Sequence, residues 1–516
     1  MPSPHAILTD LWHGLGPPAR PAPAEVVFSP GSVAARPTFD EGRAFDEVGA
    51  IDREAWRQER ARRADEGHGP ARSAPDRVTI GGDDPVLPSS FRLGAAAGAT
   101  IAAVALAASE VWRRRTGRAA PVTVDLRHAA TEFASERHLR VDGPPPGDLW
   151  DAVAGAYRCG DGGVVRIHTN FAHHRDGFLR LLGGVPPERA AVARALERRD
   201  AAAFDGAAAE AGLPCARMRT FAEWDAEPQG SAVASLPLLS TARIGDAPPE
   251  PFRAGADRPL SGLRVLDLTR IVAGPVAGRV LAAHGAEVML VTAPHLPSVP
   301  PLVVDTGRGK LSASLDLRDE AGREGLRDLI RGADVVLRAY RPGALDARGF
   351  SAEAMTALRP GLVVVTLSAY GAAGPWAGRR GFDSLVQTAT GFNHAEGEAA
   401  GTPGEPRPLP VQALDHASGY FMALGALSAL LRREREGGSW HVEASLARTG
   451  LWLRGLGRVD GAFALAPPDP APFLETVGSG FGHLTAVRHA GVVEGAPTGP
   501  TRPSVPLGTH PPRWPA

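Results

Sequence analysis

Two polar residues, Asp415 and His416, stand at the head of the long apolar run LPVQALDHASGYFMALGALSALL, residues 409–431. An aspartate in front of an apolar helix most often caps it, because its carboxylate accepts backbone N–H bonds. The same carboxylate can act as a covalent nucleophile if it stays ionised in a site that excludes water, and the positive end of a helix favours the ionised form. The two roles are compatible, so Asp415 is the first candidate for chemistry. His416 is interpreted as a core or supporting residue.

The elements that must position Asp415 alternate between short β-branched runs and helical patterns over residues 259–457. The runs LRVLDL, EVMLVT, DVVLRAY and GLVVVTLSAYG are typical of strands, and PVAGRVLAAHGA and AGREGLRDLIRGA are typical of helices. This alternation predicts βαβ units on a parallel sheet, with ligands at the carboxyl ends of the strands. We therefore expect a Rossmann-like α/β domain.

Composition divides the rest of the chain. Residues 1–85 are rich in Pro, Gly and charge and are predicted to be a partly ordered extension. A first globular segment is expected over 86–242, and the proline-rich stretch 243–258 should link it to the Rossmann-like domain. Residues 458–516 are proline-dense and should wrap over a surface rather than form a core.

Bulk properties exclude several classes of protein. Lys plus Arg number 56 and Asp plus Glu 57, so no basic field favours nucleic acid as a partner. Two cysteines, Cys159 and Cys215, fit a reducing cytoplasm. The N-terminus lacks the features of a secretory signal, and the Ala- and Gly-rich segment 93–115 favours a buried helix over a membrane span. We expect a cytoplasmic protein with no membrane partner.

One element occurs twice in the sequence. The segment LGAAAGATIAAVALAASEVWRRRTGRAAPVTVDLRHAA aligns with LDHASGYFMALGALSALLRREREGGSWHVEASLARTG, matching Leu93 to Leu414 and Gly98 to Gly419. Gly94 then falls opposite Asp415. A purely structural Asp415 would favour a capping side chain at the matching place, although glycine is a tolerable cap.

Four stretches carry a resemblance to a known family: LSGLRVLDLTRIVAGPVAGRVLAAHGAEVMLV, DTGRGKLSASLDLRDEAGREGLRDLIRGADVVLRAYRPGALDARGF, VVVTLSAYGAAGPWAGRRGFDSLVQTATG and LDHASGYFMALGALSALLRREREGGSW. Together, over about 260–450, they resemble the class III CoA-transferases, which include formyl-CoA transferase, carnitine CoA-transferase and α-methylacyl-CoA racemase. The resemblance implies that Asp415 attacks an acyl-CoA thioester to give an acyl–aspartyl anhydride. CoA thiolate then forms an aspartyl-CoA thioester, from which an acceptor carboxylate takes the CoA.

The first globular segment resembles the later half of the same family, through YRCGDGGVVRIHTNFAHHRDGFLRLLGG and AAAEAGLPCARMRTFAEWDAEPQGSA. In this chain that half comes first, which indicates a fused and rearranged double copy with one active site. The resemblance also implies a second, smaller α/β domain. Family members form interlocked dimers, so a homodimer is possible, although the fusion could satisfy part of that interface within one chain.

The resemblance also suggests positions that bind coenzyme A. Lys310 and Arg341, with Arg348 as a further candidate, stand where cations could meet CoA phosphates, and surface solvation is the alternative for the arginines. Tyr340 could pack on adenine or fill the core. The turn at Gly274 and Pro275 could present backbone N–H groups to CoA or to the acyl oxygen, or serve only close packing.

Two substitutions bear on the reaction. Val272 replaces a glutamine of formyl-CoA transferase, which argues against a formyl or oxalyl substrate. Phe382 replaces the histidine that exchanges the α-proton in the racemase, and phenylalanine accepts no proton. An acyl-CoA racemase, isomerase or hydratase, and a non-catalytic CoA-binding protein, remain the alternatives.

A metal site is not expected. His168, His173 and His174 with Cys159 match no zinc spacing, and the family requires no metal.

Overall fold

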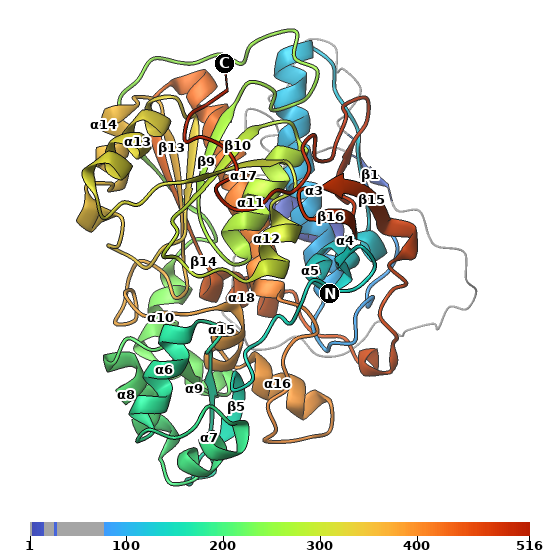
Figure 1. Cartoon of the computed structure of the whole chain (residues 1–516). Helices are drawn as coiled ribbons and strands as arrows, with labels where there is room; N and C mark the ends of the chain where they lie inside the picture. Colours follow the sequence, from blue (N-terminus) through green and yellow to red (C-terminus); the bar gives the residue numbers. More distant parts are fainter. Residues whose placement is uncertain (1–2, 15–24, 28–76, 516) are drawn as a thin grey trace, which may run out of the picture.

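The computed structural model describes residues 3–14, 25–27 and 77–515, so most of the expected N-terminal extension lies outside the described residues (Figure 1). Its largest sheet has seven strands in the order β11-β10-β9-β12-β13-β14-β8. Six strands are parallel, and β8 joins the edge antiparallel to β14. The strands are β8 (Ser240–Gly245), β9 (Arg264–Leu268), β10 (Glu287–Thr292), β11 (Lys310–Ser314), β12 (Val335–Arg338), β13 (Val363–Ser368) and β14 (Ser439–Ser445). The predicted Rossmann-like sheet is confirmed.

Helices cover both faces of this sheet, as Figure 1 shows. Neighbouring valines point to opposite faces: Val335 packs with the helices of one face and Val336 with those of the other. This double burial explains why the strands read as continuous apolar runs. One face holds α11 (Ala273–Ala283) and α17 (Ala413–Glu436), and the other holds α13 (Glu320–Arg331) and α14 (Ala352–Leu358).

A smaller α/β unit with its own apolar core lies below the large sheet in Figure 1. Its three-stranded antiparallel sheet has the order β5-β6-β7. The second α/β domain expected from the family is thus present. Its elements are β5 (Gly155–Arg158), β6 (Val164–Ile167), β7 (Cys215–Arg217), α6 (Ala172–Leu181), α7 (Arg189–Leu196) and α8 (Ala201–Glu210).

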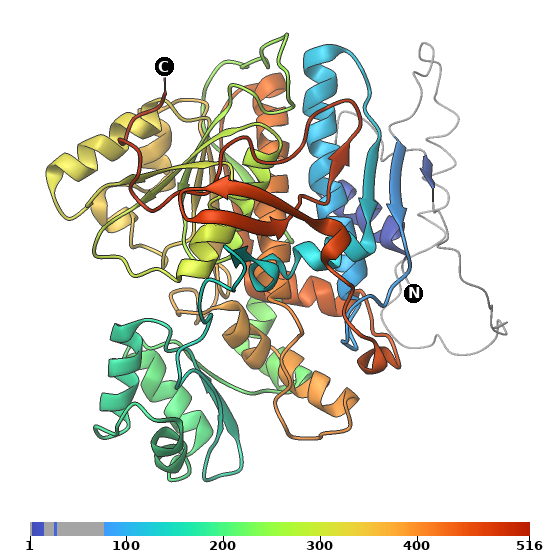
Figure 2. The ribbon, with the colours of Figure 1, turned by 45° about the vertical axis from the view of Figure 1, so that its right-hand side comes forward.

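The chain before this unit packs elsewhere, against the helical face of the large sheet. Helix α3 (Leu93–Thr116) runs beside α17 in both Figure 1 and Figure 2. Among the described residues it is the one helix long and apolar enough to span a membrane, and its apolar window is 94% buried within the protein. The predicted buried helix is confirmed. Around it lie α1 (Pro4–Gly14), β1 (Glu25–Val27), β2 (Arg77–Gly81), β3 (Val122–Asp125), α4 (Leu126–Glu132), α5 (Ser135–His138) and β4 (Arg140–Val141).

Residues 86–242 therefore do not form one compact body. They are divided among the α3 region, the smaller unit and the edge of the large sheet, and the boundary expected at residue 242 falls inside β8. The connecting helices are α9 (Phe221–Ala226), α10 (Pro228–Ser235), α12 (Pro300–Thr306), α15 (Asp383–Ala389), α16 (Phe392–Ala399) and α18 (Leu446–Gly455), with short 3-10 turns at Asp346–Arg348, Ala462–Ala464 and Ala471–Phe473.

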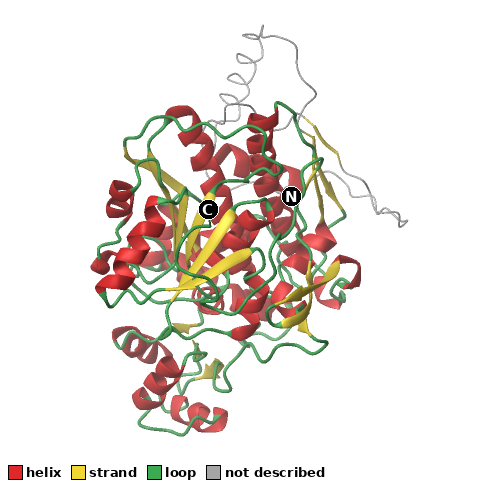
Figure 3. Cartoon of the chain, turned by 45° about the horizontal axis from the view of Figure 1, so that its top comes forward, coloured by secondary structure: helices red, strands yellow, loops and turns green. Residues whose placement is uncertain are grey.

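The C-terminal region contributes a hairpin (Figure 3) and then runs beside the edge strand β11 and helix α13 of the large sheet. Strand β16 pairs with β4, and β17 pairs with β3, so this region binds to elements from the start of the described chain. Beyond them the Gly508 N–H donates to Ser312 Oγ at 3.0 Å, and Trp514 Nε1 donates to the Leu329 carbonyl at 2.9 Å. The strands are β15 (Leu474–Ser479), β16 (Gly482–Val487) and β17 (Val492–Val493).

Candidate active site

Asp415 lines a cavity of about 190 Å³ at the carboxyl ends of β9, β12 and β13, which we call the inner compartment. This is the edge of the sheet at which a ligand was expected. The smaller unit also contributes to it, through residues at the start of α6. Its lining residues are Phe171, His173, His174, Arg270, Ile271, Val272, Ala273, Gly274, Ala339, Tyr340, Arg341, Pro342, Leu367, Ser368, Ala369, Arg379, Arg380, Gly381, Phe382, Asp415 and Leu446.

Capping of α17 is performed by a different carboxylate. The helix begins after Gln412, so Asp415 occupies its third position, and the Asp415 N–H donates to Oδ2 of Asp383 at 2.9 Å. Gln387 Nε2 donates to the other oxygen of Asp383. Within the described part of the chain, the Asp415 carboxylate itself accepts no hydrogen bond. Its side chain is therefore available to the inner compartment.

The two carboxylates have perturbed protonation. Burial raises the pKa of Asp383 to about 6, although hydrogen bonds from the Asp415 N–H and from Gln387 oppose the rise. Burial also raises the pKa of Asp415 well above its ordinary value, and the negative charges of Asp383 and Glu136 add to the effect. A buried carboxylate in a cleft with such a shift is typical of functional sites.

The turn between β9 and α11 forms one wall of the inner compartment. Ile271 has a φ of 78°, a left-handed conformation that is rare for a β-branched residue and that tends to occur at functional sites. Gly274 is needed for close packing, because a Cβ there would lie 2.3 Å from Cβ of Thr269. Gly274 lines the compartment, whereas the Pro275 carbonyl accepts a hydrogen bond from Lys310 at 2.7 Å.

Lys310 does not line the inner compartment. Its Nζ donates to Oδ2 of Asp267 at 2.8 Å, and its side chain is 1% exposed. Burial lowers the pKa of Lys310, while the Asp267 carboxylate opposes the fall. This geometry corrects the expected contact between Lys310 and a CoA phosphate. The ammonium group is enclosed between β9, β11 and α11, where it neutralises the buried carboxylate of Asp267.

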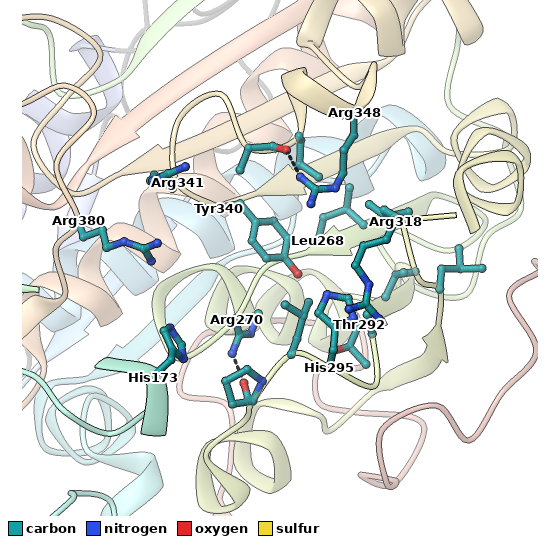
Figure 4. Close-up of a pocket in the computed structure, with 18 residues that line it drawn as sticks. His173, Leu268, Arg270, Thr292, His295, Arg318, Tyr340, Arg341, Arg348 and Arg380 are labelled. Atoms are coloured by element: carbon teal, nitrogen blue, oxygen red, sulfur yellow. Dashed lines mark hydrogen bonds between the residues drawn. The ribbon is translucent and has the colours of Figure 1, made fainter. Parts of the chain in front are cut away.

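A second cavity of about 430 Å³, the outer compartment, adjoins the inner one and shares with it His173, Arg270, Tyr340, Arg341 and Arg380. In Figure 4 the Tyr340 ring lies among the labelled side chains, with Arg341 and Arg380 to one side and Arg318 and Arg348 to the other. Arg341 and Tyr340 thus line the same compartment as Asp415, and Arg348 lines the adjoining one.

The outer compartment is lined by positive charge. Its lining includes five arginines and no acidic side chain among the described residues. Arg318 is paired with Asp316, and Arg270 donates to the Pro297 carbonyl. In the described chain neither Arg341 nor Arg380 has a hydrogen bond or ion pair from its side chain. This arrangement suits a ligand that carries several negative charges.

Sequence reasoning gave no ligand-binding role to Arg270, Arg380 or His174, and it did not predict that Asp383 caps α17. Arg270 could have been found, because it follows the strand LRVLDL by two residues at a carboxyl end. No comparable signal marks Asp383, which lies 32 residues before Asp415 in the sequence.

Phe382 lines the inner compartment at the start of α15 and stacks on His168, with ring centroids 3.8 Å apart. His416 lies in the core, where its Nε2 is 3.1 Å from Oε2 of Glu136. No group of three or more His, Cys, Asp or Glu side chains is placed to hold a metal ion in the residues that the structure describes.

Comparison with known proteins agrees with this geometry. Residues 260–459 match the family model described as CoA-transferase family III. This part of the chain is therefore similar to CoA-transferase family III. The matched residues include the large sheet from β9 onward, both α11 and α17, and the aspartate at the inner compartment.

Curated relatives are similar to part of the chain. A probable fatty acyl-CoA transferase of Mycobacterium tuberculosis is 37% identical over 233 residues, which is 42% of this chain and 58% of that protein. An acetyl-CoA:oxalate CoA-transferase of Acetobacter aceti is 33% identical, covering 36% of this chain and 51% of the relative. A succinate–glutarate CoA-transferase of Agrobacterium fabrum is 32% identical with the same coverage. The chain thus spans little more than half the length of these relatives.

Similarity to solved structures also covers only part of the chain. A crystal structure of a CaiB/BaiF family protein from Brucella suis is 30% identical and covers 44% of this chain and 65% of its own, with a TM-score of 0.36.

Proposed function

We propose that the chain is a CoA-transferase that moves CoA between an acyl-CoA thioester and a small organic acid, with Asp415 as nucleophile. The observation that carries this proposal is that two carboxylates at the start of α17 have different roles. Asp383 accepts the hydrogen bond of the helix end, and the Asp415 carboxylate is left without a partner in the described chain at the wall of a cavity. A carboxylate that makes no structural hydrogen bond and lies beside a positively charged pocket is suited to covalent catalysis.

The chemistry proceeds in balanced steps. The ionised Asp415 oxygen attacks the thioester carbonyl, the C–S bond breaks, and an acyl–aspartyl anhydride and CoA thiolate form. The thiolate attacks the aspartyl carbonyl and releases the first acid, which leaves an aspartyl-CoA thioester. An acceptor carboxylate attacks this thioester to form a new anhydride, and the thiolate then takes the new acyl group and frees Asp415. No net proton is consumed.

Coenzyme A is proposed to lie in the outer compartment, with its thiol end directed to the inner one. Arg341 and Arg348 are its proposed phosphate contacts, and Arg270 and Arg380 add charge where the two compartments meet. Tyr340 is positioned between the compartments, where its ring can pack on the ligand. The Gly274 N–H group at the start of α11 is a candidate donor to the acyl oxygen, because helix N-termini favour negative charge.

The racemase alternative is weaker at this site. Phe382 occupies the position of the racemase histidine and is stacked on His168, so it supplies no base. An assay of deuterium exchange at the α-carbon of an acyl-CoA separates the two activities.

We further propose one reacting carboxylate per chain. At Gly94, the counterpart of Asp415, a Cβ would lie 2.3 Å from Cγ2 of Val86 and 2.4 Å from Oδ1 of Asp84. The space that a nucleophile would need in the first copy is filled. The internal packing of α3 on α17 also supports the interpretation of the chain as a fused double copy, and a homodimer of such chains remains part of the proposal.

Hydroxylamine trapping tests the function. Incubation with a panel of acyl-CoAs and hydroxylamine should convert Asp415 into a hydroxamate, because an anhydride or thioester of aspartate reacts with this amine and a free carboxylate does not. Mass spectrometry should find one adduct per chain. An adduct at another residue, or none with any acyl-CoA that the protein binds, would refute the assignment.

A further inference from the structure

An unpartnered histidine borders the inner compartment. His174, in the first turn of α6, is 2% exposed, and neither of its ring nitrogens has a hydrogen-bond partner. The Nε of Arg380, which lines the same compartment, is also buried without a partner. Leaving buried polar groups unsatisfied costs free energy, so three unpartnered nitrogens at one cavity indicate that a ligand satisfies them.

The surroundings of His174 specify the chemistry of that ligand. Burial, together with the nearby charges of His173, Arg380 and Arg270, lowers the pKa of His174 to about 3, so the ring is neutral at physiological pH and donates one N–H. Arg380 adds a positive charge. A neutral donor beside a guanidinium suits a carboxylate better than it suits a cation or an apolar group.

We propose that His174 and Arg380 form a subsite for the carboxylate of the free acid substrate, next to Asp415. This inference rests on the proposed transferase function and deepens it. The acid must present a carboxylate oxygen to the aspartyl-CoA thioester, and a hydrogen bond from His174 to its other oxygen holds it for attack. CoA phosphates are bound mainly by the outer compartment, which His174 does not line.

The smaller α/β unit gains a role from this subsite. His174 comes from α6 of that unit, while Arg380 and Asp415 come from the part of the chain that is similar to CoA-transferase family III. The unit therefore contributes to the choice of acid, and residues of this unit are where specificity among acids is expected to be set.

The test measures two reactions with His174→Ala and His174→Gln. Exchange of labelled CoA into acyl-CoA without any acid reports the first anhydride step, and complete transfer reports the acid step. For His174→Ala we expect exchange at close to the wild-type rate and a KM for the acid raised by roughly 10- to 100-fold, the loss of a hydrogen bond to a charged group. His174→Gln, which retains a donor, should recover part of the difference.

A matched control is His284→Phe. His284 is also fully buried with both ring nitrogens unpartnered, but it follows the C-terminal end of α11, whereas the inner compartment lies at the other end of that helix. Its replacement should leave the KM for the acid unchanged. Thermal unfolding of every variant identifies any loss of folding.

The outcomes separate the two proposals. Absence of exchange and of transfer in the wild-type protein with every acyl-CoA would overturn the proposed function itself. Wild-type transfer combined with an unchanged KM for the acid in folded His174→Ala would overturn the subsite alone. A rise in the KM for CoA that equals the rise for the acid would also overturn it, because His174 would then serve CoA.

Discussion

Replacing Asp415 by Asn should abolish transfer and yet stabilise the folded chain above about pH 4. The variant loses the proposed nucleophile, because an amide oxygen is a very poor one. It keeps the end of α17 intact, because the acceptor there is the carboxylate of Asp383, to which the backbone N–H of residue 415 donates at 2.9 Å. What it removes from the fold is a buried acid that is 8% exposed and lies beside another acid.

The magnitude follows from the raised pKa of Asp415. Above about pH 4 the unfolded chain releases this proton while the folded chain retains it, so the free energy of unfolding falls as pH rises, by up to about 1.4 kcal/mol per pH unit. The stabilisation by Asn is therefore near zero at pH 4 and grows with pH up to the folded pKa. At pH 7 the stabilisation is at most about 4 kcal/mol, three pH units at about 1.4 kcal/mol each, and burying the amide offsets part of it.

Urea denaturation of both proteins at pH 4, 5.5 and 7 checks this expectation. Asp267→Asn is the matched control, since Asp267 is also buried but is paired with Lys310. It should lose stability at all three values. Equal stability of Asp415→Asn and wild type at pH 7, or a loss there, would show that Asp415 is not a strained buried acid. Retained transfer activity would refute its role as nucleophile.

Three further outcomes are expected. Asp383→Asn should move the acid limb of kcat/KM to lower pH, because the charge of Asp383 raises the pKa of Asp415; an unmoved limb would assign the limb to another group. Arg341→Ala should weaken CoA binding, measured by calorimetry, by about 1–3 kcal/mol at unchanged stability. Lys310→Ala should instead lower the free energy of unfolding by about 3–5 kcal/mol, because it leaves a buried carboxylate unpaired. Weaker CoA binding in Lys310→Ala, with no effect on binding in Arg341→Ala, would return the phosphate contact to Lys310. Gly94→Asp should destabilise the chain, because its Cβ has no room, and should leave hydroxylamine labelling at one adduct; two adducts would contradict the single site.

Much of the large domain could be predicted from the sequence. The run LRVLDL became β9 and DVVLRAY became β12, because strands buried on both faces are apolar throughout and stand out from the helical pattern. The position of Asp415 at the head of α17 followed from the apolar run behind it.

The partners of these residues could not be predicted in the same way. Periodicity indicates which face of an element is buried, but it does not indicate which distant charge lies opposite. Lys310 was expected at a ligand and is paired with Asp267, which lies 43 residues earlier. His174 and Arg380 are separated by more than 200 residues, and only the docking of the smaller unit brings them to one cavity.

The packing of α3 along α17 has a consequence for how the protein behaves on dilution. Both helices belong to one polypeptide, so their contact forms at an effective concentration set by the intervening chain rather than by the amount of protein present. An obligate dimer loses such a contact when its subunits become scarce. Here the contact between α3 and the helix that carries Asp415 is intramolecular, so dilution of the protein does not remove it.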